Sequence, residues 1–388
     1  MTNTILKKIN ILQIIFISFI LRFLSLVFYK NQNLPDTYTY ERIGEEIFSG
    51  KIIQTPLHMP GYGIWMYILN YITQNNYGVI FGDILISCLT VYIIYLLSIE
   101  IFKIEMIAKI AALIFAVYPF SIFYSFNAVS ETLFIFLLYS SILMLYRKKI
   151  LYGYILIILS IYVKPTSDIF APFLIICFCF LIYKYSKKET LRELFIFYIL
   201  YSLLLSPWWV HNWNKYDGFV RLNLAGGYHL YSGNNPENKT GGGIGGTDVN
   251  HKWTDDDIEK RGIEFEKKFK SDAFNYIKEN PKTFVKLSFI KFKRFWQLYP
   301  YAEEYKGTVY KLVSIFSYGL VLLFSILFFI SNIKKFFFRI SPLVIIILLT
   351  TTIHCITIAS VRYRFPIEPI LIIFAAYYLF ERLKLLRS

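Results

Sequence analysis

The chain has 388 residues, of which 56% are hydrophobic, and its mean hydropathy is +0.49. The apolar residues come in long blocks, which excludes a single soluble globule and predicts an all-α polytopic membrane protein. The formal net charge of +15 could indicate nucleic-acid binding, but no nucleic-acid-binding motif is present. Basic loops that face anionic lipid headgroups are the usual source of such a charge in membrane proteins. The four cysteines lie in apolar runs and lack the spacing of a zinc site.

Apolar blocks that could cross a membrane recur along the chain. They fall near 11–29, 79–99, 107–124, 131–146, 151–163, 168–184, 194–210, 311–331, 340–358 and 366–381. We therefore expect about ten transmembrane helices, with roughly nine to twelve as the range, because several blocks are shorter than the roughly 20 residues that span hydrocarbon. The first block follows Lys7 and Lys8 and lacks a small-residue cleavage site, which favours an uncleaved signal-anchor.

The basic residues of the short loops are unevenly distributed between the two sides of the membrane. With ten spans, both termini share one side, and the loops on that side hold most of the Lys and Arg residues. Because cytoplasmic loops carry this excess, we expect cytoplasmic termini and a multi-pass protein of the cell membrane.

Two segments on the opposite, outer side are long. The first, 30–78, contains an amphipathic piece at Tyr62–Tyr71 that we expect to lie along the membrane surface. The second, 211–308, is the part with a soluble character. It contains a glycine-rich run (Gly241–Asp248) without P-loop features and a charged helix candidate, Asp255–Asn280, that Pro281 should stop. The sequence thus divides into a transmembrane module (1–210), an outer segment (211–308) and C-terminal transmembrane helices (309–388).

Charged and polar residues that interrupt apolar sequence collect at the outer ends of the predicted helices. A cluster of acids and cations at headgroup level suits a reaction on a lipid phosphate, because cations neutralise the phosphate and an acid handles a proton. The residues are Asp36, Glu131, Lys164, His211, Arg362 and Arg364.

Each of these residues also has a purely structural interpretation. Asp36 could be a loop residue or a helix cap, and Glu131 could be an acid favoured by a helix dipole. Lys164 could extend toward the interface, and His211 could pair with a carbonyl. The two arginines depart from the charge bias of the short loops, so a task is expected for at least one.

Several motifs follow one another in an order that resembles the C-type-fold integral-membrane glycosyltransferases, which use polyprenyl or dolichyl phosphate sugars. This superfamily includes protein O-mannosyltransferases and aminoarabinose transferases. The similar stretches are DTYTYERIGEEIFSG from Asp36, MPGYGIWMYIL from Met59, SETLFIFLL from Ser130, KPT from Lys164, PWWVHNW from Pro207, GNNP from Gly233 and RYRFPIEP from Arg362.

The resemblance implies a polytopic C-type architecture with outer-face juxtamembrane helices. It implies a glycosyltransferase that moves a sugar from a polyprenyl-phosphate-linked donor to an acceptor hydroxyl, with inversion. Asp36 and Glu131 would be the catalytic acids. Lys164, His211, Arg362 and Arg364 would bind the donor phosphate, and Tyr40, His58 and Tyr62 would support the acceptor side. Some similar proteins contain a divalent metal near the acids, so a divalent metal is a possible cofactor, and the sequence leaves this question open.

The sequence departs from the family pattern in places. His211 stands where Arg is frequent, which would make its phosphate role dependent on pH. Lys164 also stands where many similar proteins carry Arg. Between the arginines, the two-residue spacing indicates different directions on one helix, and Glu368 is a candidate partner for one of them.

The identity of the acceptor stays open between a glycan, a lipid and a protein, and membrane lipids are the surrounding partners. Two alternatives also remain. One is a transporter or flippase of a lipid-linked or anionic substrate, and the other is a different outer-face polyprenyl-dependent transferase or ligase.

Overall fold

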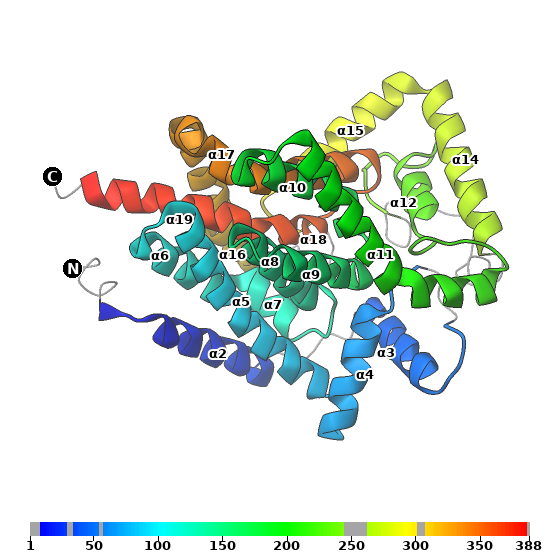
Figure 1. The fold of residues 1–388 in the computed structure, drawn as a ribbon, viewed down its shortest axis with the longest axis horizontal. Helices are drawn as coiled ribbons and strands as arrows, with labels where there is room; N and C mark the ends of the chain where they lie inside the picture. The colour runs from blue at the N-terminus through cyan, green and yellow to red at the C-terminus, as the bar shows by residue number, and fades with distance from the viewer. Residues whose placement is uncertain (1–7, 29–33, 54–56, 244–261, 301–306, 386–388) are drawn as a thin grey trace.

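The computed structural model describes residues 8–28, 34–53, 57–243, 262–300 and 307–385, and these ranges are helical without any strand. Figure 1 shows a bundle of long helices with both termini at one end and a group of shorter helices at the other. The bundle contains α2 (Ile11–Phe28), α5 (Gly78–Phe102), α6 (Glu105–Ala116), α7 (Pro119–Ser125), α8 (Glu131–Tyr146), α9 (Ile150–Val163), α10 (Thr166–Cys177), α11 (Lys187–Tyr216), α16 (Thr308–Ser314), α17 (Leu320–Ile356), α18 (Val361–Arg364) and α19 (Glu368–Leu385).

The second group lies at the end opposite the termini in Figure 1. It contains α3 (Pro35–Phe48), α4 (Gly61–Thr73), α12 (Gly226–Gly233), α14 (Ile263–Glu279) and α15 (Pro281–Trp296). The helices α12 and α14 share a small apolar cluster of their own, built on Phe265 and Phe269, while the other buried residues form one large core.

Six helical runs in the described part of the chain are long and apolar enough to cross a membrane, and the bent pair α6–α7 would make seven. They are Ile11–Phe28, Gly78–Phe102, Thr166–Tyr183, Lys187–Tyr216, Thr308–Ile356 and Val361–Lys384. Each of the predicted apolar blocks contains a helix, so a multi-pass membrane protein is confirmed. The expected ten spans are not confirmed.

Helix length and continuity account for this difference. The helices α8 and α9 have 16 and 14 residues, fewer than the roughly 20 that cross hydrocarbon. The predicted blocks 311–331 and 340–358 belong to one run, because the basic residues between them stay helical. Within that stretch the Lys335 ammonium donates to the Tyr377 hydroxyl at 3.0 Å, and Arg339 donates to the carbonyl of Ile101 at 3.3 Å.

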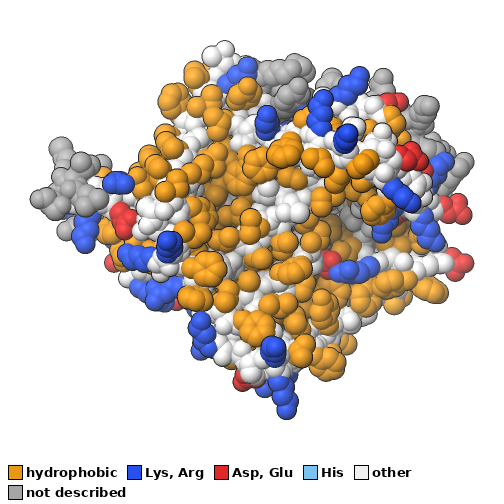
Figure 2. All heavy atoms as spheres, turned by 90° about the horizontal axis from the view of Figure 1, so that it is seen from above, with side chains coloured by type: hydrophobic (Ala, Val, Ile, Leu, Met, Phe, Trp, Pro, Cys, Tyr) orange, Lys and Arg blue, Asp and Glu red, His pale blue; other side chains and the backbone are white. Residues whose placement is uncertain are grey.

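The two ends of the bundle differ in their charged residues. Arg147, after the last turn of α8, pairs with Glu100 near the end of α5 at 3.0 Å, and Arg339 reaches the same end of α5. Figure 2 shows a broad hydrophobic surface across the middle of the molecule, with Lys and Arg at the side of the termini and mixed charges at the opposite side. A hydrophobic zone between two charged ends fits a protein embedded in a bilayer.

One charge lies fully buried inside the first span. Among the described residues, no acid pairs with Arg22 of α2, which donates instead to hydroxyl and carbonyl oxygens of three other elements. These are Ser87 of α5 (2.8 Å), the carbonyl of Ala116 (2.9 Å) and Ser121 of α7 (2.9 Å). Because an unsatisfied guanidinium in hydrocarbon is costly, this network fixes where α2 docks.

The two outer segments differ in part from the sequence-based expectation. The amphipathic piece expected at Tyr62–Tyr71 is α4, which buries Tyr62 and Met66 against the protein. The helix expected at Asp255–Asn280 is present from Ile263, its first residues lie outside the described residues, and Pro281 opens α15 as well as ending α14. Most of the glycine-rich run lies outside the described residues too.

Candidate active site

Local sequence positions three of the predicted site residues at helix boundaries. Asp36 lies in the first turn of α3, which begins with a proline, and Glu131 lies in the first turn of α8. Acids are favoured at these positions by the helix dipole. Lys164 has an extended backbone (φ −141°, ψ 124°) and ends α9, because the following Pro165 disfavours a helical conformation there.

Arg362, in the short helix α18, joins the two predicted acids. Its Nη1 donates to Oδ2 of Asp36 at 2.6 Å, and its Nη2 donates to Oε2 of Glu131 at 3.1 Å. A second contact runs from its Nε to Oε1 of Glu131. The guanidinium thus forms a two-point contact with one carboxylate and a single contact with the other, which is geometry that lysine cannot reproduce.

Lys164 completes this cluster, which we call the acid–cation cluster (Asp36, Glu131, Lys164 and Arg362). The Lys164 ammonium donates to Oε1 of Glu131 at 2.7 Å. The Glu131 side chain is fully enclosed, whereas the side chains of Asp36 and Arg362 are 28% and 29% exposed. Two acids and two cations from α3, α8, the α9–α10 junction and α18 therefore meet, with one acid inside and the other at the surface.

Burial and the charges of the cluster shift the pKa values of Asp36 and Lys164. Burial raises the pKa of Asp36, but Arg362 and His58 together outweigh this effect and hold that pKa below its ordinary value. Burial lowers the pKa of Lys164, and Glu131 opposes this change. Asp36 is consequently ionised at neutral pH.

The three residues predicted on the acceptor side lie next to the cluster. The Tyr40 hydroxyl donates to Ser130 at 3.0 Å, and the Tyr40 ring meets His58 and Tyr62 edge to face at 5.0 and 4.9 Å between centroids. Burial lowers the pKa of His58, while the nearby Asp36 acts to raise it. These aromatic rings form the wall on the Asp36 side of the cluster.

Sequence reasoning missed two residues behind this wall. Asp83 of α5 is fully buried and accepts from the Tyr62 hydroxyl (2.6 Å) and the Trp65 indole (3.0 Å). His229 of α12 is close enough for Asp36 and His58 to influence it, and burial lowers its pKa to about 4. An isolated acid in an apolar block was a signal for Asp83. No local signal marked His229.

Arg364 does not join the acid–cation cluster. Its side chain is fully buried, pairs with Glu368 at 2.7 Å, and stacks over the Tyr318 ring at 3.4 Å. It also donates to the carbonyls of Phe295 (3.1 Å) and Gln297 (2.5 Å). The structure therefore places Arg364 in an interhelical network and not in the acid–cation cluster. The pairing with Glu368 is the one expected for one of the two arginines.

His211 also lies apart from the cluster. Its ring stacks on Trp208 of the same helix at 5.0 Å, and its Nε2 is buried without a hydrogen-bond partner among the described residues. The charge that acts on it is that of Lys215, on the same helix. His211 therefore does not join the acid–cation cluster, since its ring lies against Trp208 of its own helix.

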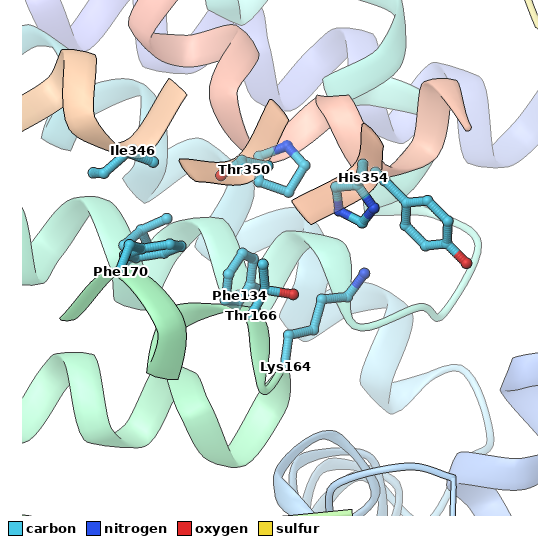
Figure 3. Close-up of a pocket in the computed structure, with 10 residues that line it drawn as sticks. Phe134, Lys164, Thr166, Phe170, Ile346, Thr350 and His354 are labelled. Atoms are coloured by element: carbon cyan, nitrogen blue, oxygen red, sulfur yellow. The ribbon is translucent and has the colours of Figure 1, made fainter. Parts of the chain in front are cut away.

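A pocket opens beside Lys164 between α8, α10 and α17. Figure 3 shows Lys164, Thr166 and His354 at one end, and Phe170 and Ile346 toward the other. His354, which sequence reasoning missed, contacts the Ile358 carbonyl through Nδ1 (3.0 Å) and stacks on Tyr363 at 4.6 Å. The pocket thus has a polar end at the cluster and an apolar end inside the bundle.

A metal ion was a possible cofactor of this site. Across the described ranges, no three His, Cys, Asp or Glu side chains come close enough together to hold one.

Comparison with known proteins connects this geometry to a fold. The sequence matches no protein-family profile and no curated protein significantly. The structure is similar to the archaeal oligosaccharyltransferase AglB from Archaeoglobus fulgidus in complex with an inhibitory peptide and a dolichol-phosphate, with a TM-score of 0.59 and 15% identity. The match covers 98% of this chain and 51% of that one.

The same enzyme tethered to an acceptor peptide containing the NVT sequon matches with a TM-score of 0.57 and 16% identity, over 97% of this chain and 50% of that one. This chain has the fold of half of that enzyme. It spans about half the length of the solved structures that it matches. A likeness at this level of identity concerns the fold alone, and it agrees with the polytopic helical architecture expected from the sequence.

Proposed function

We propose that this protein is a glycosyltransferase that moves a sugar from a polyprenyl-phosphate-linked donor to an acceptor hydroxyl, with inversion at the anomeric carbon. The carrying observation is the acid–cation cluster, whose member Lys164 lies at the polar end of a pocket that is apolar at its other end. A lipid phosphate has the complementary form, a charged group on a hydrocarbon chain.

The two acids of the cluster take different roles in this proposal. Asp36, which is partly exposed, accepts the proton of the acceptor hydroxyl or orients that hydroxyl. Glu131 is enclosed and bound by both cations, so it is a positioning residue that holds Arg362 and Lys164 toward the donor. The partly exposed cations contact the phosphate.

The reaction then proceeds by displacement. The acceptor oxygen forms a bond to the anomeric carbon, the bond from that carbon to the phosphate oxygen breaks, and the lipid phosphate leaves with the electron pair. Arg362 and Lys164 stabilise the charge that develops on this phosphate. A phosphate that binds Arg362 also competes with Asp36 for the guanidinium, so donor binding frees Asp36 to act as a base.

The solved structures of the similar enzyme support this assignment. One contains a dolichol-phosphate, and another contains a tethered acceptor peptide. The acceptor of this chain is a glycan, a lipid or a protein. We place the site on the outer face and the termini in the cytoplasm, because the basic loop residues gather at the end opposite the cluster. In this proposal the chain consists of a transmembrane module (1–210), an outer segment (211–308) and C-terminal transmembrane helices (309–388).

Deletion of the gene, followed by mass comparison of envelope glycans, glycolipids and glycoproteins, tests the function. One class should lose a defined sugar mass, wild-type protein should restore it, and Asp36→Asn should not. The matched control is Glu45→Gln, which neutralises an exposed acid of the same helix and should restore the mass. Full restoration by Asp36→Asn would remove Asp36 from the mechanism.

A transporter or flippase remains the competing function and needs its own test. Purified protein in detergent should consume a lipid-linked donor extracted from the native membrane, since an enzyme needs no compartment. Consumption that requires sealed vesicles would instead indicate transport.

A further inference from the structure

The charge of α15 differs from that of its neighbour. Its sequence, PKTFVKLSFIKFKRFW, contains five basic residues and no acid, whereas acids and lysines alternate along α14, IEFEKKFKSDAFNYIKE. A helix with unbalanced positive charge on its exposed face is complementary to an anionic partner.

Three faces follow one another around α15. Leu287, Lys291 and Phe295 form its buried face. Beside it runs an exposed apolar stripe of Val285, Phe289 and Phe292, with 53%, 65% and 47% of their surfaces accessible. The exposed Lys282, Lys286 and Lys293 lie along the next edge, at helical spacing from one another. An apolar stripe bordered by lysines is the pattern of a helix that lies in a membrane interface.

The position of α15 places these faces at membrane level. Lys291 donates to the carbonyl of Ile356, the last residue of α17, at 3.0 Å, and Arg294 donates to the carbonyl of Ala359 at 2.9 Å. The Phe295 ring stacks on His354 inside the last turns of α17. Figure 1 shows α15 alongside this end of α17. A helix anchored to the end of a membrane-spanning run lies where headgroups lie.

We propose that α15 binds anionic phospholipid headgroups in the leaflet at the cluster end of the bundle. Lys282, Lys286 and Lys293 contact the headgroup phosphates, and Val285, Phe289 and Phe292 enter the border of the acyl chains. The apolar stripe favours lipid over a soluble polyanion, which would leave these aromatic side chains in water. This surface is separate from the pocket and from sugar transfer, so its test does not depend on the proposed function.

Native mass spectrometry of the whole protein tests the headgroup contact. Protein reconstituted in equal parts of phosphatidylglycerol and phosphatidylcholine should retain phosphatidylglycerol preferentially after extraction. The K282Q/K286Q/K293Q variant should lower that preference by at least about fivefold, because one lysine near an anionic membrane surface already contributes about fivefold in affinity. The control K267Q/K270Q/K278Q removes the same charge from exposed positions of α14 and should leave it unchanged. An equal effect of both variants, or no preference in the wild type, would overturn the proposal.

A second measurement leaves the lysines in place and so does not depend on how the charge variant folds. In a background with the four cysteines replaced, a nitroxide at Phe289→Cys should collide more with oxygen than with a water-soluble nickel chelate in anionic nanodiscs. A nitroxide at Phe274→Cys, on an exposed position of α14, should show the opposite ratio. A water-exposed label at position 289 would mean that a soluble anionic partner, and not the bilayer, occupies this face.

Discussion

Arg362 and Arg364 share a four-residue helix but bind different carboxylates. Arg362 contacts Asp36 and Glu131 in the candidate site, while Arg364 contacts Glu368 inside the bundle. Side chains two positions apart on a helix face nearly opposite directions, so one residue reaches the site and the other the core. The same stretch of sequence thereby serves the proposed chemistry and the stability of the fold.

Substitution of the two arginines should separate these roles. Arg362→Ala should lower sugar transfer by about 10²–10³-fold while the protein stays folded, because it removes a cation at the leaving phosphate. Arg364→Ala should lower the free energy of unfolding by about 3–5 kcal/mol, since it leaves Glu368 buried without its partner. Transfer assays and thermal melting in detergent measure the two effects, and equal, mild effects of both variants would contradict the assignment.

Removal of Glu131 should destabilise the cluster through repulsion. Glu131→Ala leaves Arg362 and Lys164 facing each other in a partly buried site, with an expected loss of about 3–5 kcal/mol. Glu105→Ala is the control, because Glu105 is 63% exposed and pairs with Lys109 on the surface, where a pair contributes about 0–1 kcal/mol. Similar melting temperatures for the two variants would contradict a central role of Glu131.

The Asp36–Arg362 pair should be insensitive to pH across the neutral range. Since the folded-state pKa of Asp36 is lowered, its stabilisation is complete above the ordinary carboxyl pKa and is lost as pH falls through the lower folded value. The difference in melting temperature between wild type and Asp36→Asn should stay constant from about pH 8 to 5 and begin to shrink near pH 4. A change between pH 7 and 5 would show that the pKa is raised instead.

Lys291 should make stability rise with pH in the alkaline range. Burial lowers the pKa of Lys291 to about 7, and Cys355 opposes this change. The neutral amine still donates two hydrogen bonds, to Asn234 (2.9 Å) and to the carbonyl of Ile356 (3.0 Å). Between about pH 7 and 10 the unfolded lysine holds a proton that the folded one lacks, so folding gains stability as pH increases.

The melting temperature of wild type should therefore increase relative to that of Lys291→Met as pH rises from 7 to 9. The exposed Lys293 of the same helix is the control, and Lys293→Met should track the wild type at every pH. A flat difference for Lys291→Met would indicate that Lys291 stays charged.

Gly44 should be required for the contact between α3 and α4. A Cβ atom at this position would lie 2.6 Å from the carbonyl oxygen of Gly63 and 2.8 Å from Cβ of Tyr67, both on α4. Gly44→Ala should push the helices apart and cost about 1–3 kcal/mol, with a shift of Asp36 and reduced transfer. Gly50→Ala has open space around it and a positive φ of 71°, so a cost of about 1–2 kcal/mol without displacement of α4 is expected there. Crosslinking between α3 and α4 distinguishes the two variants.

Much of the fold was predictable because its signals are local. Apolar runs identify helices by composition, and each predicted block contains a helix in the structure. The number of spans was not predictable in this way. Whether Lys335 and Arg339 end a helix or continue it depends on partners such as Tyr377 and Ile101, which come from distant parts of the chain.

The sequence by itself determined a helical membrane protein with acids and cations at the helix ends of one side, because charge is excluded from hydrocarbon wherever it lacks a partner. The tertiary structure decided which charges from distant parts of the chain meet. The rotation of α18 about its axis sends Arg362, and not Arg364, to Asp36 and Glu131. This rotation is set by packing between distant helices, and no pattern in the local sequence encodes it.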